Sequence, residues 1–109
     1  MTAPSLDSVE AARRRIAPFI IATPMVPWAG EELAGLLGGA PPPVVKLELF
    51  QRTGSFKPRG ALNVALQLTP DARDRGFTAV SAGNHAAAVA YAARALGASA
   101  KVVMPKSAS

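Results

Sequence analysis

Residues 77–104 read FTAVSAGNHAAAVAYAARALGASAKVVM, and this stretch decides the expected fold. Its first five residues, 77–81, form a short and mostly apolar run that is typical of a strand. A glycine turn follows, and the alanine-rich run 84–96 predicts a helix that Gly97 ends. Residues 101–104 then predict a second strand. This order of strand, helix and strand indicates two parallel strands joined by a right-handed helical crossover.

The residues before this unit predict one more strand followed by a helix. Residues 44–50 alternate apolar and charged side chains from Val45 onward, which predicts a strand with Lys46 and Glu48 on one face. We expect the next helix to open at the turn 53–55, with Ser55 as its cap and with a proline in its first turn. Its polar stripe comprises Arg59, Asn63 and Gln67.

The remaining segments supply helices and connections. Ser5 can cap a helix over residues 6–16, and Thr69 can open a short helix before Gly76. Residues 19–43 are rich in proline and glycine and are expected to be mostly connection, with a short helix over 31–37. The expected fold class is therefore α/β, an open and mostly parallel sheet with flanking helices.

Composition excludes several classes of function. The chain has 109 residues, half of them apolar, and a net charge of +5. Apart from Arg13–Arg15, which we expect to be a solvated helix end, the basic residues are scattered and not interleaved with aromatic ones, so no nucleic-acid partner is expected. The absence of cysteine removes disulfides and thiolate metal sites, and no metal site is expected. Without a signal-type segment or a long apolar run, we expect a cytoplasmic protein that enters no membrane.

Lys57 stands in the first turn of a predicted helix, where exposed amides disfavour a positive charge. Such a position, with Phe56 beside it and partial burial, favours the neutral amine, which attacks aldehydes. The alternative is an exposed lysine whose ammonium group swings away from the helix start. Position alone does not decide between the two.

A second candidate site is the turn Ser81-Ala82-Gly83-Asn84-His85. Its glycine lets the backbone approach a ligand, and the helix start offers free amides to an anion, either a carboxylate or a phosphate. A plain turn is the alternative. Because ligands bind at the carboxyl ends of strands in open α/β sheets, we expect Lys57 and Asn84 at neighbouring strand ends on one edge.

The string KLELFQRTGSFKPRGA, residues 46–61, resembles the cofactor-lysine segment of the fold-type-II pyridoxal-phosphate enzymes, in the threonine/serine dehydratase and serine racemase branch. The resemblance covers residues 46–97 well, and it implies the tryptophan-synthase-beta-like fold and pyridoxal 5'-phosphate as cofactor. It implies that Lys57 is the catalytic lysine that holds the cofactor as a Schiff base. It also places Phe56 against the cofactor ring, although an ordinary core phenylalanine is equally compatible.

The same resemblance assigns roles to the second turn. It implies that the substrate carboxylate is bound there, and that the Asn84 side chain also donates to the phenolic oxygen of the cofactor. For His85 we expect carboxylate anchoring or a helix-cap contact rather than the role of base. The residues implied for the carboxylate are Ser81, Gly83, Asn84 and His85.

The expected function is that of a threonine/serine dehydratase, an ammonia-lyase that converts L-threonine or L-serine to 2-oxobutanoate or pyruvate plus ammonia. Serine racemases carry a second proton-bearing group, a serine, where this sequence has Ala82, which favours elimination over racemisation. The expected partner is a small hydroxy amino acid, and the full-length form is expected to be a homo-oligomer.

The resemblance also places residues 1–109 as the amino-terminal part of a catalytic domain whose remainder is absent. The glycine-rich phosphate loop of the family and the residue that faces the pyridine nitrogen lie beyond position 109. Two alternatives follow. The chain is a truncated form that binds pyridoxal phosphate weakly or only pairs with another chain, or it is an unrelated α/β anion-binding module, which would leave Lys57 unexplained.

Overall fold

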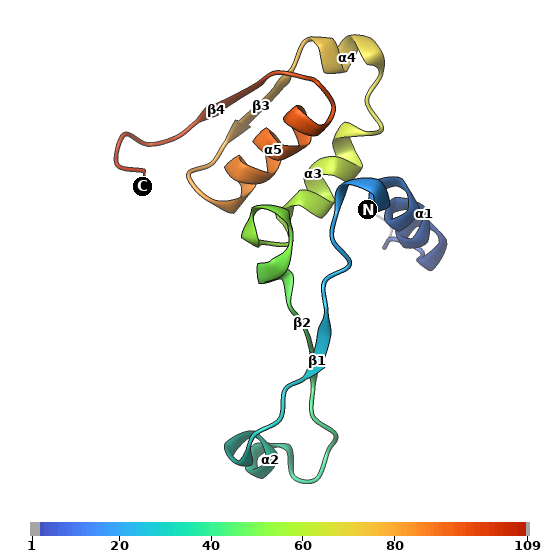
Figure 1. Cartoon of the computed structure of the whole chain (residues 1–109), viewed down its shortest axis with the longest axis vertical. Helices are drawn as coiled ribbons and strands as arrows, with labels where there is room; N and C mark the ends of the chain where they lie inside the picture. The colour runs from blue at the N-terminus through green and yellow to red at the C-terminus, as the bar shows by residue number, and fades with distance from the viewer. Residues whose placement is uncertain (1–2, 109) are drawn as a thin grey trace.

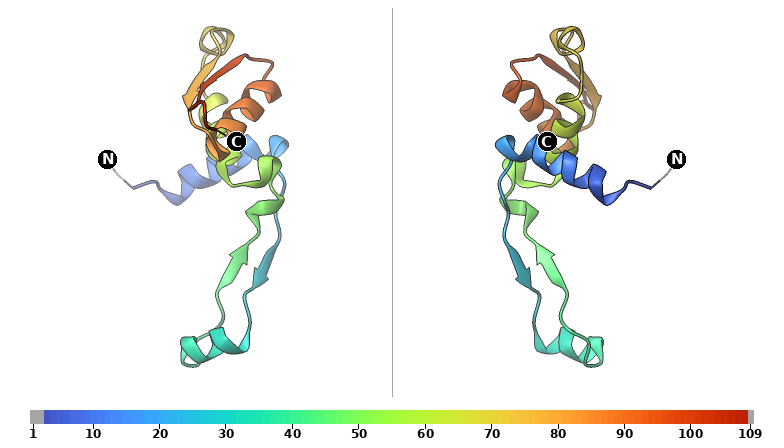
Figure 2. Two further views of the ribbon diagram at one scale, coloured as in Figure 1. Left: turned by 90° about the vertical axis from the view of Figure 1, so that its left-hand side faces the viewer. Right: turned by 90° about the vertical axis from the view of Figure 1, so that its right-hand side faces the viewer.

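The computed structural model describes residues 3–108. A body of helices and a parallel strand pair carries a long arm of two antiparallel strands (Figure 1). Side views show that the arm and helix α1 leave the body in different directions (Figure 2). The α/β class is confirmed. The helices are α1 Leu6–Ile16, α2 Glu31–Leu37, α3 Lys57–Ala65, α4 Pro70–Asp74 and α5 Asn84–Ala95, and the strands are β1 Met25–Pro27, β2 Val44–Lys46, β3 Phe77–Val80 and β4 Ala100–Val103.

The predicted strand, helix and strand unit is confirmed as β3, α5 and β4. β3 and β4 pair in parallel from Phe77 opposite Ala100 onward, and α5 packs against both. Gly76 starts this unit with a φ of +82°, where a side chain would be strained, and a Cβ atom there would lie 3.0 Å from the backbone oxygen of Ser99. Only glycine therefore lets the two strands start side by side.

The strand predicted over residues 44–50 is confirmed as far as Lys46 and wrong beyond it, because the chain turns into a short 3-10 helix over Glu48–Phe50. β2 pairs antiparallel with β1 in a separate ribbon and does not join the β3–β4 sheet. The segment 19–43 thus contains a strand that its prolines concealed, because Pro27 ends β1 at an edge where no amide donor is needed. The short helix within it is confirmed as α2.

Two of the three predicted helix caps are confirmed. The Ser5 hydroxyl accepts from the amide of Ser8 at 3.2 Å, and the Thr69 hydroxyl accepts from the amide of Ala72 at 3.3 Å. The cap predicted at Ser55 is wrong, because α3 starts two residues later and no side chain caps it. Ser55 is instead buried, and its Oγ has no hydrogen-bond partner within residues 3–108.

The hydrophobic core lies where α1, α3 and α5 meet. Leu62 of α3 is completely buried there, and Ile16 is the only buried residue of α1. Leu6 and Val9, which share the apolar side of α1, are exposed, so this helix contributes to the core only through its last turn. The buried cluster consists of Ile16, Leu62, Ala65 and Ala92.

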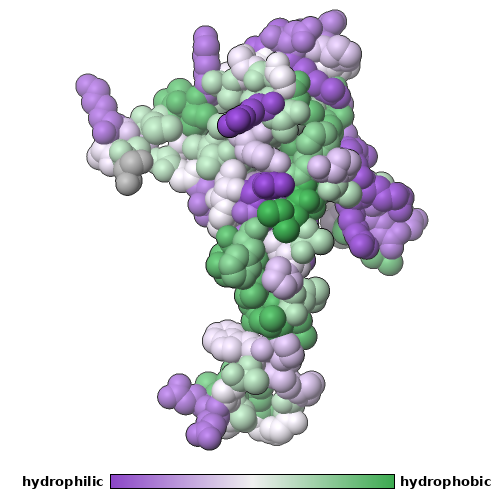
Figure 3. Space-filling model, viewed as in Figure 1, coloured by the Kyte–Doolittle hydropathy of each residue, from purple (hydrophilic) through white to green (hydrophobic). Residues whose placement is uncertain are grey.

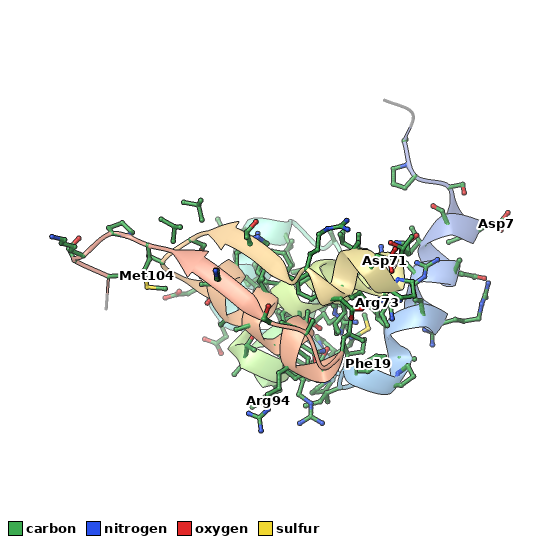
Figure 4. The ribbon with its side chains drawn as sticks, turned by 90° about the horizontal axis from the view of Figure 1, so that it is seen from above. Asp7, Phe19, Asp71, Arg73, Arg94 and Met104 are labelled. Carbon is green, nitrogen blue, oxygen red and sulfur yellow. The ribbon has the colours of Figure 1, made fainter. Side chains whose placement is uncertain are left out.

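Helix α5 buries one face among the described residues, although its composition indicated packing on several sides. The small alanine side chains on this face let α3 approach closely, and α3 and α5 share the most extensive contact between two helices. Arg94, near the end of α5, points away from the body (Figure 4). The buried residues of α5 are Ala88, Val89, Ala92 and Ala93.

The arm exposes apolar side chains (Figure 3). Trp28 follows β1 and is 61% exposed, and its amide donates to the carbonyl of Pro43 on the opposite strand at 2.8 Å. Met25 and Val44 of the ribbon are exposed as well. Within residues 3–108, no helix has the length and apolar character needed to cross a bilayer.

Candidate functional site

Lys57 lies in the first turn of α3, as the sequence predicts, where it is the first helical residue, and it is exposed. Pro58, which needs no amide donor in a first turn, is fully buried behind it. The Lys57 Nζ lies 5.1 Å from the centroid of the Phe56 ring, within the range of a cation–π contact. Phe56 is 59% exposed, so the partial burial expected around this lysine is wrong for the described residues.

An open groove of about 640 Å³ lies between α3, α5 and the start of β3. Lys57, Phe56 and His85 all contribute to its lining. The structure thus brings the two helix starts to one cavity, which has room for an aromatic ring. The other lining residues are mostly apolar and include Ala61, Val64, Leu68, Phe77 and Val89.

The turn before α5 forms a local hydrogen-bonded loop. The amide of Gly83 donates to the Ser81 hydroxyl at 3.3 Å, and Gly83 is the N-cap of α5. Asn84 and His85 follow as exposed residues of the first helical turn, whose amides have no partner within the helix. His85 lines the groove, whereas Ser81, Gly83 and Asn84 are not among its lining residues. Of the residues implied for the carboxylate, the structure places one in the groove with Lys57.

The expectation that Lys57 and Asn84 lie at neighbouring strand ends is wrong. Lys57 follows two 3-10 turns, and the strand before them belongs to the arm rather than to the β3–β4 sheet. Helix packing brings the two turns together instead, because α5 contacts both α3 and the 3-10 turn Arg52–Gly54.

A polar cluster at the base of the arm was not predicted. The Glu48 carboxylate accepts hydrogen bonds from Arg59 Nε at 2.8 Å and Nη2 at 2.7 Å, and from the Thr23 hydroxyl at 2.5 Å. Lys46 Nζ donates to the carbonyl of Thr23 at 3.0 Å. No spacing rule pairs an acid with an arginine eleven residues later across a turn. We call Thr23, Lys46, Glu48 and Arg59 the arm-base cluster.

Gln51 fixes the same junction through its side-chain amide. It is buried, its Oε1 accepts from the amide of Ile21 at 2.9 Å, and its Nε2 donates to the carbonyl of Ile21 at 2.8 Å. A second contact fixes the same segment to α5, because the hydroxyl of Tyr91 on α5 donates to the carbonyl of Phe19, which lies beside this helix (Figure 4). The segment between α1 and β1 is therefore tied both to the turn before α3 and to α5.

The arm-base cluster predicts acid sensitivity. The hydrogen bonds from Arg59 are the largest cause that lowers the pKa of Glu48 from 4.5 to about 2, and the Thr23 hydroxyl acts in the same direction. Because this pKa is depressed, the stabilisation is complete above pH 4.5 and is lost as the pH falls from about 4.5 to about 2. Between pH 6 and pH 3 the free energy of unfolding should fall by about 1 to 2 kcal/mol through Glu48 alone.

Urea unfolding followed by far-UV circular dichroism at both pH values measures this loss. The Glu48→Gln variant should lose less stability than the original chain over the same interval. Glu10→Gln is the matched control, because Glu10 faces Arg14 at 3.7 Å in an exposed pair. An equal acid loss in the original chain and in Glu48→Gln would contradict the assignment.

Residues 16–109, which include every residue of the groove and of the arm-base cluster, match a family described as pyridoxal-phosphate dependent enzyme. The chain belongs to this family. Its fold agrees with that assignment, because maize serine racemase superposes with a TM-score of 0.86 at 37% identity, over 99% of this chain and 32% of the racemase. The sequence resemblance to fold-type-II enzymes is thereby confirmed for the part of the fold that the chain covers.

Two curated members of the pyridoxal-phosphate family carry dehydratase names. A putative threonine dehydratase of Sinorhizobium fredii is 47% identical over 100 residues, which are 92% of this chain and 29% of the relative. Phenylserine dehydratase of Ralstonia pickettii is 44% identical over 109 residues, 99% of this chain and 32% of that enzyme. The chain therefore spans about a third of the length of the curated relatives that it matches.

The described residues fit part of a pyridoxal-phosphate site. An exposed primary amine, an aromatic ring beside it and an open, mostly apolar groove suit a planar aldehyde. Lys57 would hold this aldehyde covalently, and Phe56 would contact its ring. When bound, the cofactor supplies an electron sink for the carbanion that forms at a substrate α-carbon.

Proposed function

We propose that this chain supplies the lysine part of the active site of a pyridoxal-phosphate-dependent dehydratase for hydroxy amino acids. Its substrates are L-threonine or L-serine, and its products are 2-oxobutanoate or pyruvate plus ammonia. The observation that carries the proposal is the exposed Lys57 amine in one groove with Phe56 and His85. The dehydratase names of the two curated relatives support it. The proposal includes a cytoplasmic homo-oligomer for the whole protein.

The residues of the chain divide the work between holding the cofactor and holding the substrate. The Lys57 Nζ would hold the cofactor and would also be the base that removes the α-proton of the substrate. The β-hydroxyl then leaves with a proton as water, and hydrolysis of the resulting unsaturated amine consumes a water and yields the keto acid and ammonia. Substrate and products therefore balance as one hydroxy amino acid for one keto acid and one ammonia.

The turn 81–85 binds the substrate carboxylate. Its free helix-start amides and the side chains of Ser81, Asn84 and His85 are the donors, and Gly83 allows close approach. His85 is the one of these residues that lines the groove with Lys57. We therefore assign His85 to anchoring of the carboxylate, with Lys57 as the base.

A racemase is the second candidate, favoured by the similarity to maize serine racemase. Racemisation needs one group to remove the α-proton and another to return a proton on the opposite face. Ala82, just before Gly83, has a methyl side chain that carries no exchangeable proton. Elimination is therefore the proposed reaction.

A chimera tests the reaction. In it, this chain replaces the matching 29% of the Sinorhizobium fredii relative. With pyridoxal phosphate and L-threonine or L-serine, the chimera should release keto acid, detected by coupled oxidation of a reduced nicotinamide. The 109-residue chain alone should release none while still forming a borohydride-reducible adduct at Lys57. A chimera with a bound cofactor that interconverts L- and D-serine, or releases no keto acid, would overturn the dehydratase assignment.

A further inference from the structure

The first turn of α3 lacks the devices that usually fix a helix start. Its N-cap residue, Phe56, makes no side-chain hydrogen bond, and the Ser55 hydroxyl is unpartnered within residues 3–108. The contacts that hold this turn to the rest of the chain are the buried ring of Pro58 and the guanidinium of Arg59. The direction in which Lys57 leaves the helix therefore depends on these neighbours.

Arg59 is held by a planar two-point contact. Its Nε and Nη2 each donate to a different oxygen of Glu48, which fixes the orientation of the guanidinium as well as its position. The two side chains are only 29% and 17% exposed, so water competes weakly with the pair. The exposed pair of Glu10 and Arg14 has no such geometry.

Glu48 is itself anchored to a third segment. The Thr23 hydroxyl donates to the same carboxylate, and Lys46 donates to the carbonyl of Thr23. A contact at Arg59 thus ties the first turn of α3 to both strands at the base of the arm. Lys57 is two residues before Arg59 on the same turn.

We propose that Glu48 and Arg59 form a positioning clamp that fixes the first turn of α3 and so aims the Lys57 amine into the groove. The inference rests on the proposed function of Lys57 and adds two positioning residues, of which Arg59 also lines the groove and Glu48 does not. It explains why the turn stays ordered without a capping side chain. It predicts that loosening the clamp misdirects Lys57 without unfolding the chain.

Competition among the four lysines of the sequence measures this aim. The chain is treated with limiting pyridoxal phosphate, reduced with borohydride and digested, and the label at Lys57 is compared with the label at the exposed Lys106. The ratio should favour Lys57 in the original chain and fall about tenfold in Glu48→Gln and in Arg59→Gln, since a charged hydrogen-bonded pair is lost. Arg59→Lys keeps the charge without the two-point contact, so its labelling ratio should lie between that of the original chain and those of the two glutamine variants.

Folded controls separate aim from stability. Glu10→Gln should keep the original labelling ratio, and far-UV circular dichroism at 10 °C should show equal helix content in all variants. Hydrogen exchange gives a readout that needs no cofactor, because the amides of residues 59–62 close the first turn of α3. They should exchange about tenfold faster in Glu48→Gln than in Glu10→Gln.

The outcomes for the clamp and for the proposed function are distinct. An original chain without preference for Lys57 would refute the proposed function, and the clamp would then stand or fall on hydrogen exchange. Unchanged exchange at residues 59–62 in folded Glu48→Gln would overturn the clamp. An unchanged labelling ratio in Glu48→Gln and in Arg59→Lys would overturn it as well.

Discussion

Replacement of Lys57 by arginine is expected to abolish covalent capture of pyridoxal phosphate by α3. Arginine keeps the positive charge and a similar length, but its guanidinium stays protonated and does not form a stable Schiff base. Cofactor titration should therefore lose the part of the visible absorption that Lys57 contributes and keep only the weaker part from the other lysines. After borohydride reduction, the peptide that contains position 57 should carry no added mass.

The matched control is Lys101→Arg, which changes an exposed lysine of β4. This variant should retain the visible absorption and the label at Lys57. Retention of the absorption in Lys57→Arg, or its loss only in Lys101→Arg, would refute Lys57 as the cofactor lysine. Because arginine preserves the charge at the helix start, a change in local electrostatics would not explain the expected loss.

Truncation of Leu62 to alanine should cause the largest loss of stability from a single side chain. Leu62 is completely buried where α1, α3 and α5 meet, and within residues 3–108 it is the largest apolar side chain that is completely buried. Removal of its branched end loses apolar burial and leaves a cavity that a small core fills poorly. We expect a loss of about 3 kcal/mol in the free energy of unfolding, within the usual range of about 2 to 5 kcal/mol for such changes.

Val64→Ala is the control on the same helix, because Val64 is 62% exposed. It should change the free energy of unfolding by no more than about 0.5 kcal/mol. Urea denaturation followed by circular dichroism at 222 nm measures both variants. Equal midpoints for Leu62→Ala and Val64→Ala would show that the core at the three-helix junction does not dominate stability.

The sequence correctly predicted those elements whose signals come from residues a few positions apart. The cap at Ser5, the closing glycine at position 76 and the strand, helix and strand order of residues 77–103 all depend on neighbours a few positions apart. The strand predicted over 44–50 is too long because the alternation of apolar and charged residues continues where the chain turns and Glu48 contacts Arg59. That contact is between segments, and no local pattern contains it.

The candidate site also has a part that the sequence predicts and a part that depends on contacts between distant segments. The helix-start positions of Lys57 and of Asn84 and His85 follow from turn chemistry and were predicted correctly. The sequence did not predict what brings the two helix starts together. They approach through packing between α3 and α5 and do not lie at adjacent strand ends. The roles given to Ser81, Gly83, Asn84 and Phe56 remain predictions for the labelling and turnover experiments.

The exposed position of Trp28 decides what an optical experiment on this chain can detect. The sequence contains one tryptophan, and it directly follows β1, a strand of the arm that extends away from the junction of α1, α3 and α5 (Figure 1). In the folded chain its fluorescence emission should already resemble that of an indole in water. Unfolding of the core should therefore change the tryptophan emission spectrum little. A blue shift would instead signal that another surface has covered the arm, which makes the native fluorophore a built-in reporter of association.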